Sequence, residues 1–517
     1  MHADLSRSTF RPERHYSAVV AQQGRVQLDA DLNEQAAIQL HLARTLAADL
    51  IGPHGGPGGP GRPTGFHIDY VGGKQDIDTL TISPGRYYVD GILCDATRPA
   101  PGTPVPHDGT EEPPAPEADT AWDYWTQPDA FRDPERDQLP SPARSPFVVY
   151  LKVWERAVSA AEDPALREVA LGAALPDTAV RSKVVWQVLP LTLSELDIEE
   201  SDPSVDTVRG KFDTWAGKQA APAGRLAARS ERPEHADEDP CLVRPDARYR
   251  GPENQLYRVE VHAGGAAGQA TFKWSRENGS VVFPVDELDG TWVQLATLGL
   301  DDKLDLDVDD LVEFTDTAYA SRLEPLPLPR VEELDLPGRR VRLSAEPDPR
   351  VGRLPHLHPF LRRWDHHEAP RRKGRTTALK GGAVPLTEGE WLTLEDGVEV
   401  YFAKNGSYRT GDHWLIPART ATGSVEWPTD AARRPLLQAP AGIARHFAPL
   451  ALIKGEGGSV DLRLSFGPLA TDVKPADQGT LDAEALAARE EQAAEAAPSG
   501  GRSQTTAAAE AAAEGDE

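Results

Sequence analysis

Short runs rich in β-branched and aromatic residues, many of them alternating between apolar and polar, recur through most of this 517-residue chain. A period of two is the pattern of a half-buried strand, whereas a helix repeats about every 3.6 residues. Gly, Pro, Asn or charged residues separate the runs, which lie at 79–83, 147–154, 183–189, 256–262, 398–402 and 413–417. We therefore predict a mainly β protein with minor α content, built from antiparallel sandwich-like or barrel-like modules.

The length of the chain requires several such modules, because one hydrophobic core stops growing near roughly 250–300 residues. Gly/Pro-rich and acidic stretches mark the predicted boundaries. These give an N-terminal hairpin and helix over 1–52, a Gly/Pro linker over 53–65, a small β module over 66–118, a β module with an irregular or helical insertion over 119–240, a sandwich-like module over 241–350, a C-terminal β module over 351–471, and a disordered Ala/Glu-rich tail over 472–517.

The clearest local signal is a predicted hairpin that leads into a helix at the start of the chain. Residues 15–20 and 25–28 have strand-like patterns around the turn-forming pair Gln23-Gly24. Asp31, with Glu34 three residues later, suits the positive end of a helix dipole. A stripe at helical spacing then runs to Gly52-Pro53, where the helix should end. The stripe consists of Leu32, Ala36, Leu40, Ala43, Ala47 and Leu50.

Composition argues against several classes of partner. The chain has 55 Lys and Arg against 82 Asp and Glu, a formal net charge of −27, which repels nucleic-acid phosphates. No run approaches the roughly 18 uninterrupted apolar residues of a membrane span. Residues 1–7 lack the apolar region of a secretory signal, so we expect synthesis to end in the cytoplasm. Cys94 and Cys241 cannot form a disulfide framework or a thiolate zinc site.

Two polar runs invite a metal interpretation but lack the required spacing. In the first, which contains His356, His358, His366 and His367, no HExxH pattern occurs and a proline interrupts the run; we predict a loop or edge strand with solvated histidines and Trp364 packed inward. The acidic run 305–310 has Asp310 where a calcium loop needs glycine, so we predict an acidic turn before a strand. Nucleophile-elbow, P-loop and dinucleotide motifs are also missing. We predict no catalytic residue, no metal and no cofactor.

Tryptophans beside the predicted strands allow two interpretations. Large aromatic side chains supply much of the buried area of small β modules, so most of these rings should be core anchors. The alternative is an exposed platform that stacks on sugars. The residues concerned are Trp154, Trp186, Trp274, Trp364, Trp391 and Trp414.

Several longer motifs resemble an uncharacterised family of large proteins found near phage-tail and extracellular contractile injection genes. The first motif covers Phe10–Tyr16 and Gln22–Gln35, and its opening also looks like the start of some phage baseplate and tail-fibre proteins. The others are Gly85–Gly91, Trp154–Arg156, Asp177–Arg181, Phe272–Gly279 and Tyr408–Arg419. The resemblance spans the chain up to about residue 449. Some relatives carry C-terminal repeats, whereas this chain ends in its Ala/Glu-rich tail, which argues against a receptor-binding fibre.

The resemblance implies a non-enzymatic structural component of a contractile phage-tail-like injection particle: a baseplate-peripheral, cage-like or adaptor part. Its partners would be baseplate, sheath or tube neighbours, with assembly in the bacterial cytoplasm and release in an extracellular particle also open. We predict that the N-terminal segment docks onto the particle through Tyr16, Gln23, Gly24, Arg25, Asp29, Asp31, Asn33 and Glu34. The competing interpretation is that these residues only stabilise the local fold.

Deleting residues 1–50 should then abolish particle association and leave the β modules folded. No apolar heptad seam identifies a homo-oligomer, so the oligomeric state is open. Two other classes of function also remain open: a carbohydrate- or surface-binding module, and a hydrolase on a β scaffold.

Overall fold

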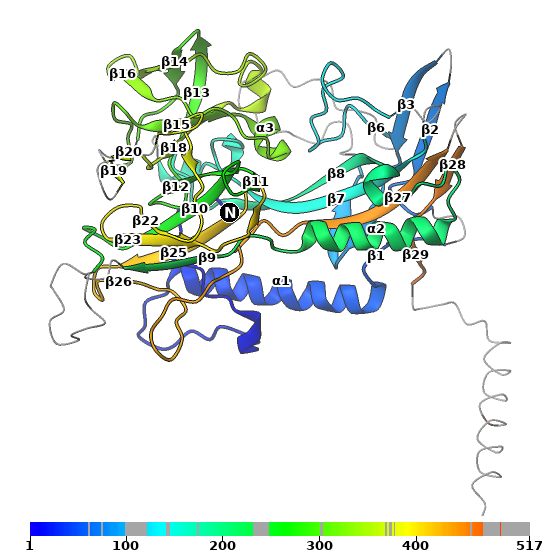
Figure 1. Cartoon of the computed structure of the whole chain (residues 1–517), viewed down its shortest axis with the longest axis horizontal. Coiled ribbons are helices and arrows are strands. Elements are labelled where there is room, and N and C mark those ends of the chain that lie inside the picture. Colours follow the sequence, from blue (N-terminus) through cyan, green and yellow to red (C-terminus); the bar gives the residue numbers. More distant parts are fainter. Residues whose placement is uncertain are drawn as a thin grey trace, which may run out of the picture. The chain divides into compact units, whose positions relative to one another are not determined.

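The computed structural model describes residues 1–59, 63–73, 76–98, 121–140, 145–172, 175–230, 248–299, 303–367, 370–371, 375–376, 378–454, 458–468 and 486. Residues 1–466 form one compact unit. That unit is mainly β, with antiparallel sheets and few helices, which confirms the predicted fold class (Figure 1). Apart from Leu486, the predicted disordered tail lies outside the described residues, as does Cys241.

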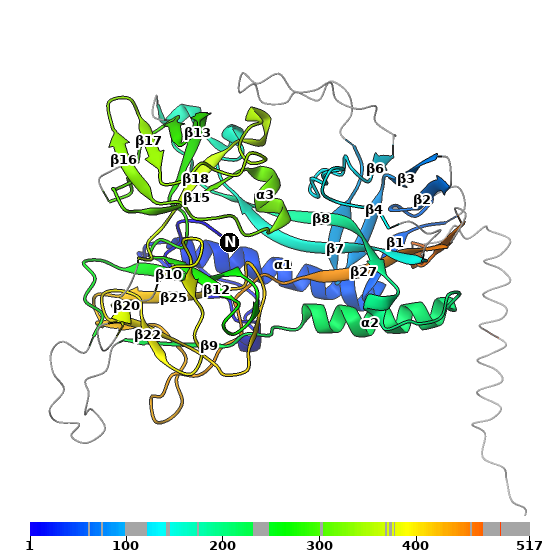
Figure 2. The same cartoon turned by 45° about the horizontal axis from the view of Figure 1, so that its top comes forward.

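A four-stranded antiparallel sheet is the centre of one half of the unit. Its strand order is β28 (Gly458–Asp461), β27 (His446–Lys454), β7 (Phe147–Val158) and β8 (Arg181–Thr192). One face carries an apolar core shared with two smaller sheets. Helix α2 (Val205–Ala220) packs on the other face through Val208 and Phe212, and Figure 2 shows it beside β27.

The two smaller sheets contain the first strands of the chain. One has the order β2 (Ile68–Gly73), β3 (Asp76–Ile82) and β6 (Trp122–Asp123). The other has the order β29 (Ser465–Phe466), β1 (His54–Pro57), β4 (Arg86–Val89) and β5 (Ile92–Asp95), with β1 and β29 parallel. Strand β1 lies inside the predicted Gly/Pro linker, which is a correction. Glycine suits β1 because a Cβ on Gly56 would lie 2.4 Å from Thr64 Cγ2.

The other half contains a five-stranded and a three-stranded sheet that share one core. The five-stranded sheet has the order β21 (Val384–Pro385), β12 (Thr271–Ser275), β10 (Gln255–Ala263), β25 (His413–Arg419) and β26 (Ser424–Val425). The three-stranded sheet has the order β22 (Trp391–Thr393), β23 (Val398–Phe402) and β9 (Leu226–Ser230). Tyr257, Val259 and Val261 of β10 project into the shared core.

A six-stranded sheet with its own core lies next to β12. Its order is β15 (Leu311–Thr315), β18 (Phe360–Trp364), β13 (Val282–Asp289), β14 (Trp292–Leu295), β17 (Arg340–Leu343) and β16 (Val331–Asp335). Helix α3 (Thr317–Arg322) packs against this core. The remaining strands are the pairs β11 (Gly265–Ala266) with β24 (Ser407–Tyr408) and β19 (Pro370–Arg371) with β20 (Arg375–Thr376). Single 3-10 turns lie at Pro12–Arg14, Pro164–Leu166, Val169–Leu171, Ser194–Leu196 and Pro355–Leu357.

Strand pairing crosses the predicted module boundaries. Strand β7 pairs with β27, and β10 pairs with β25, although each pair joins segments that we had assigned to different modules. Local alternation predicts that a strand exists but carries no information about its partner. The described part of the chain is therefore interleaved and does not follow the predicted series of consecutive modules.

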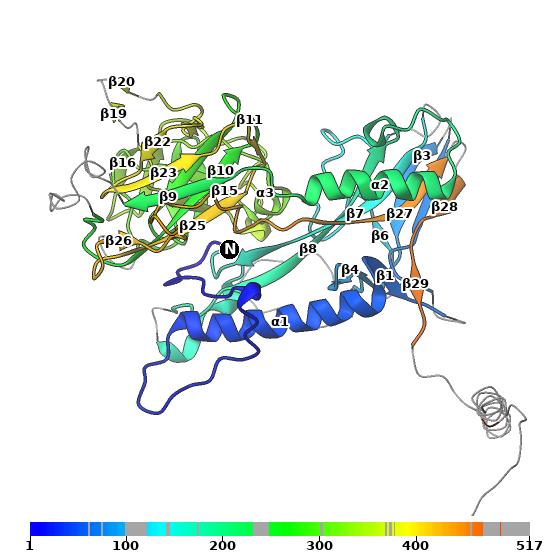
Figure 3. The same cartoon turned by 60° about the horizontal axis from the view of Figure 1, so that its bottom comes forward.

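Helix α1 (Asp29–Ile51) confirms the predicted N-terminal helix, and Gly52 N–H donates to Ala48 O at its end. The helix lies against the turn between β4 and β5, where a Cβ on Gly91 would come within 2.1 Å of Arg44 O. Arg44 also pairs with Glu155 of β7 at 2.8 Å. In Figures 1 and 3, no other described element lies along the C-terminal half of α1 on the side that faces away from the sheets.

Candidate functional site

The segment before α1 forms the predicted turn but not the predicted hairpin. Arg25 N–H donates to Gln22 O, and Gly24 has a φ of 70°. Residues 15–28 contain no strand, which corrects the prediction. A lone two-stranded ribbon has no layer to pack on, and Val19 N–H donates to Gln35 Oε1 of α1 at 2.7 Å.

Three of the predicted docking residues hold the N-terminal arm, residues 1–13, or the helix start in place. Asp29 accepts hydrogen bonds from Ser6 N–H and Oγ–H at 2.9 and 2.6 Å. Burial acts to raise the pKa of Asp29, but these bonds outweigh it and hold the pKa below its usual value. Asp31 accepts from Leu28 N–H, and Glu34 accepts from Thr9 Oγ1–H at 2.6 Å. The alternative interpretation, that these residues stabilise the local fold, is sufficient to explain the contacts of Asp29, Asp31 and Glu34.

The other predicted docking residues are exposed: Tyr16, Gln23, Gly24, Arg25 and Asn33. The role of all eight in docking therefore stays a prediction.

The most apolar face of helix α1 is exposed, and a different face of the helix packs against the rest of the protein. Only Ala30 and Ile38 are buried among its 23 residues. Leu32, Leu46 and Leu50 are 63%, 61% and 67% exposed, and Ala36 and Ala43 between them are also exposed. We call the face formed by Leu32, Ala36, Gln39, Ala43, Leu46 and Leu50 the outer face. Its spacing alternates between four and three residues, as in a coiled coil, but Gln39 interrupts the apolar series, so the face is not a continuous apolar heptad seam.

A second site is a buried ionic network where the five- and six-stranded sheets meet. Glu260 of β10 receives hydrogen bonds from Arg258 Nε at 2.6 Å and shares one with His2 Nε2 at 2.9 Å. Lys273 Nζ of β12 lies 3.4 Å from Glu260 Oε1 and 2.9 Å from Glu313 Oε1 of β15. The ammonium therefore bridges carboxylates of the two sheets.

The rest of the network comes from β18. Trp364 Nε1–H donates to Glu313 Oε2 at 3.2 Å, and Lys273 Nζ lies 4.2 Å from the centre of the Trp364 ring. Arg362 NH1 lies 3.8 Å from Glu313 Oε2. Burial acts to raise the pKa of Glu313, but Lys273 and Arg362 outweigh it and lower the pKa. Both carboxylates of the network are therefore ionised at neutral pH.

The network lies where the motifs of the sequence meet. Met1 O and Ala3 O accept hydrogen bonds from Asn278 Nδ2–H at 3.0 and 2.8 Å, which ties the N-terminal arm to the Phe272–Gly279 motif. His413 of the Tyr408–Arg419 motif lies opposite Glu260 in the β10–β25 ladder. Segments far apart in the sequence thus form one polar junction.

Close to this junction, the Phe272–Gly279 motif also contains a half-buried carboxylate, that of Glu277. Glu277 is flanked by Arg363 at 3.5 Å and Lys303 at 3.4 Å, yet neither of its carboxylate oxygens has a hydrogen-bond partner in the described part of the chain. Burial and the neighbouring Asp365 raise the pKa of Glu277 to about 7, although Arg363 opposes the shift. The group is therefore partly protonated near neutral pH.

Sequence reasoning missed the network. Arg258, Glu260 and His262 alternate with apolar residues, a pattern that predicts a solvent-facing side of β10. The structure buries that side as well as the apolar one. The sequence does place opposite charges on four strands, β10, β12, β15 and β18. These charges indicate a network only once it is known which strands lie together.

The two runs considered for metals serve structural roles. In the described residues no group of three or more His, Cys, Asp or Glu is arranged to hold a metal ion. Trp364 is buried, as predicted, but His366 is buried too and shares a hydrogen bond through Nε2 with Gly382 O at 2.8 Å, so the expectation of solvated histidines is wrong there. The acidic run forms the predicted turn before β15, with Asp307 N–H donating to Asp310 Oδ2.

Most of the tryptophans are core anchors, as predicted. Trp154, Trp186, Trp274, Trp364 and Trp414 are buried, and Trp391 is half-buried under the Arg229 guanidinium at 3.9 Å. These rings therefore present no exposed, coplanar stacking face.

The protein is therefore mainly β, with an exposed apolar face on α1 and a buried ionic network between two sheets. The chain belongs to a family of unknown function (DUF6519), whose model matches residues 1–213 and 207–516. Neither a curated protein nor a solved structure matches the sequence. No described helix is long and apolar enough to cross a membrane.

Proposed function

We propose that this chain is a structural, non-enzymatic component of a contractile phage-tail-like injection particle, and that it docks through the outer face of α1. The outer face is the observation that carries the proposal. A long helix that exposes five leucines to water, three of them on the outer face, forgoes the burial that stabilises most protein helices. Contiguous exposed apolar surface on a folded protein commonly marks an interaction site. The resemblance of the N-terminal motif to baseplate and tail proteins supports the particle as the setting.

The occupant that fits the outer face is an apolar helix of a different particle protein. Between Leu32 and Leu50 the only basic side chain other than histidine is Arg44, which is turned toward Glu155. Apolar burial rather than ion pairing would therefore drive contact. A second copy of the chain fits less well, because a net charge of −27 on each copy opposes self-association.

Substitutions on the outer face test docking better than deletion of residues 1–50. The N-terminal arm and α1 make contacts across the unit, including those of His2 with Glu260, Arg44 with Glu155 and Arg419 with Ser6 O. Deleting residues 1–50 would uncover the ionic network, so we now expect that deletion to destabilise the β sheets as well. Substitutions confined to the outer face separate docking from folding.

The test is affinity purification of the tagged full-length chain from its native host, with mass spectrometry of the co-purified proteins. Sheath, tube or baseplate proteins are expected with the wild-type chain. A wild-type preparation that contains the chain alone, or that turns over a substrate without any particle protein, would contradict the proposal. Size-exclusion chromatography with light scattering detects a second copy as the alternative occupant.

A further inference from the structure

A cavity of about 980 Å³ lies where the N-terminal arm and α1 cover the ionic network. Its walls include residues of β7, β10, β12, β15 and β18 as well as the chain between 410 and 446. Pockets of roughly 300–1,000 Å³ accommodate small organic ligands. The outer face of α1 shares only Ala36 with this cavity, so a ligand there would be a property additional to the proposed function.

Four buried nitrogen atoms on residues of the cavity wall have no hydrogen-bond partner among the described residues. They are Trp154 Nε1, Arg156 Nε, His262 Nδ1 and Arg362 Nε, and their residues are 1%, 7%, 6% and 8% exposed. Trp and Arg side chains can only donate hydrogen bonds, and His262 can donate through Nδ1 in one tautomer. A buried donor without an acceptor is costly and rare in native proteins. The donors call for an acceptor group from outside the chain.

The charge at this end of the cavity also favours an anion. Arg258, Lys273 and Arg362 face only two carboxylates, Glu260 and Glu313, so the network has one excess positive charge. Burial and the neighbouring Lys273 lower the pKa of His262 to about 4, so this ring is neutral at pH 7 and does not change the balance.

Elsewhere on the wall, three of the basic side chains are already matched with acidic ones. These pairs are Arg44 with Glu155, Arg156 with Glu162 and Arg7 with Glu426. The excess positive charge therefore remains at the ionic network.

Away from the network the wall is mainly apolar. The apolar residues include Leu5, Phe10, Leu40, Leu323, Leu415 and Ile443. A ligand that satisfies both ends needs an anionic head and a hydrocarbon body. We propose that the cavity binds an aliphatic carboxylate, with its carboxylate at Arg362, Trp154 and His262 and its chain along the apolar wall.

Isothermal titration calorimetry of the full-length chain with octanoate, 1-octanol and octylamine tests the assignment. Octanoate should bind saturably, one molecule per chain, and about tenfold or more tighter than 1-octanol, because charged hydrogen bonds are stronger than neutral ones. Octylamine should bind more weakly than either. Equal binding of octanoate and 1-octanol, or no saturable binding of octanoate, would overturn the proposal.

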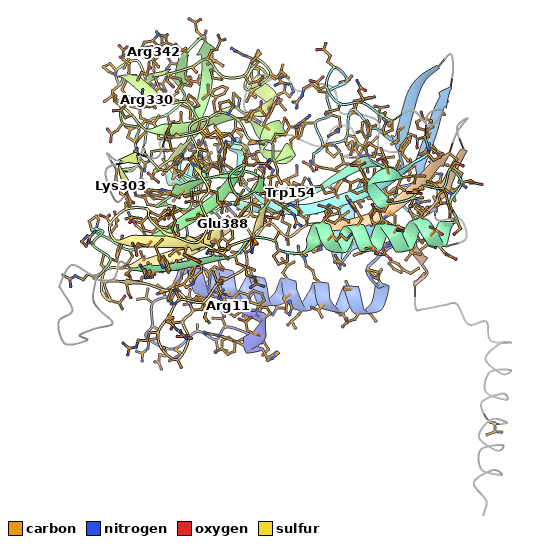
Figure 4. All side chains as sticks on the ribbon, in the orientation of Figure 1. Arg11, Trp154, Lys303, Arg330, Arg342 and Glu388 are labelled. Carbon is orange, nitrogen blue, oxygen red and sulfur yellow. The ribbon has the colours of Figure 1, made fainter. Side chains whose placement is uncertain are left out.

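Variants identify the carboxylate site. Arg362→Gln should reduce the octanoate preference to nearly none, while Lys273 still pairs with Glu313. Trp154→Phe and His262→Phe remove the unpartnered nitrogens at similar volume and should each weaken octanoate binding several-fold; they carry the test if Arg362→Gln does not fold. Arg342→Gln is the matched control, since Arg342 is a surface residue far from Trp154 in Figure 4. Unchanged octanoate binding in the folded cavity variants would refute the site.

Discussion

Replacing Leu32, Leu46 and Leu50 with glutamine should separate docking from folding. All three side chains are more than half exposed, so the isolated protein gains little from them. Glutamine has nearly the helix propensity of leucine. We therefore expect α1 to persist and the thermal unfolding midpoint to stay close to that of the wild-type chain.

The expected loss of docking follows from the exposed fractions. Complete burial of a leucine side chain contributes about 1.5–3 kcal/mol. With roughly two thirds of each side chain left for a partner to cover, each leucine would contribute about 1–2 kcal/mol and the three together about 3–6 kcal/mol. This range corresponds to a weakening of the dissociation constant by roughly two to four orders of magnitude.

Quantitative pull-down of the particle with the tagged triple variant measures the effect, and circular dichroism and thermal unfolding check the fold. The matched controls are Leu336→Gln and Leu354→Gln, which change leucines that are 50% and 51% exposed but lie outside α1. Particle proteins should be lost only with the triple variant. Full recovery of the particle with a folded triple variant would show that the outer face is not the docking surface.

Three further predictions concern stability. The pKa of Glu277 is raised to about 7 in the folded protein, so its stabilising contribution is complete below the unfolded pKa of 4.5 and is lost as pH rises through 7. Glu277→Gln should therefore raise the thermal unfolding midpoint at about pH 8 and hardly change it at about pH 4.5. Burial lowers the pKa of His366 to about 4, so the folded protein loses stability as pH falls from 6.5 toward 4, and His366→Gln should flatten that part of the midpoint-against-pH curve; an unchanged slope would contradict the assignment. Gly91→Ala should lower the thermal midpoint, with a cost on the order of 1–3 kcal/mol, because its φ is 75° and its Cβ would meet Arg44 O; a neutral result would show that α1 can shift without cost.

Most of the local structure, apart from the hairpin expected at 15–28, was predictable from the residue pattern alone. Period-two patterns predicted the strands around 147–154, 256–262 and 413–417, and helical spacing with Gly52 predicted α1, because these signals depend on backbone geometry within a few residues. The turn at Gln23-Gly24 was predictable for the same reason, and the burial of Trp364 and Trp414 was predictable from the large apolar area of their rings. Of the two acidic residues predicted at the helix start, Asp31 accepts a local hydrogen bond from Leu28 N–H, whereas Glu34 accepts one from Thr9, 25 positions away.

Which strands pair and which faces are covered depended on contacts between segments far apart in the chain. The pairing of β10 with β25 joins residues more than 150 positions apart and places His413 beside Glu260. Contacts with the six-stranded sheet and the N-terminal arm bury Arg258, Glu260 and Lys273, which a local pattern assigns to solvent. The same distinction applies to α1, because the spacing of its leucines predicts a helix whatever that helix packs against. Whether that stripe faces a core or water depends on what the rest of the chain packs against it, and here the packed side is that of Ala30 and Ile38.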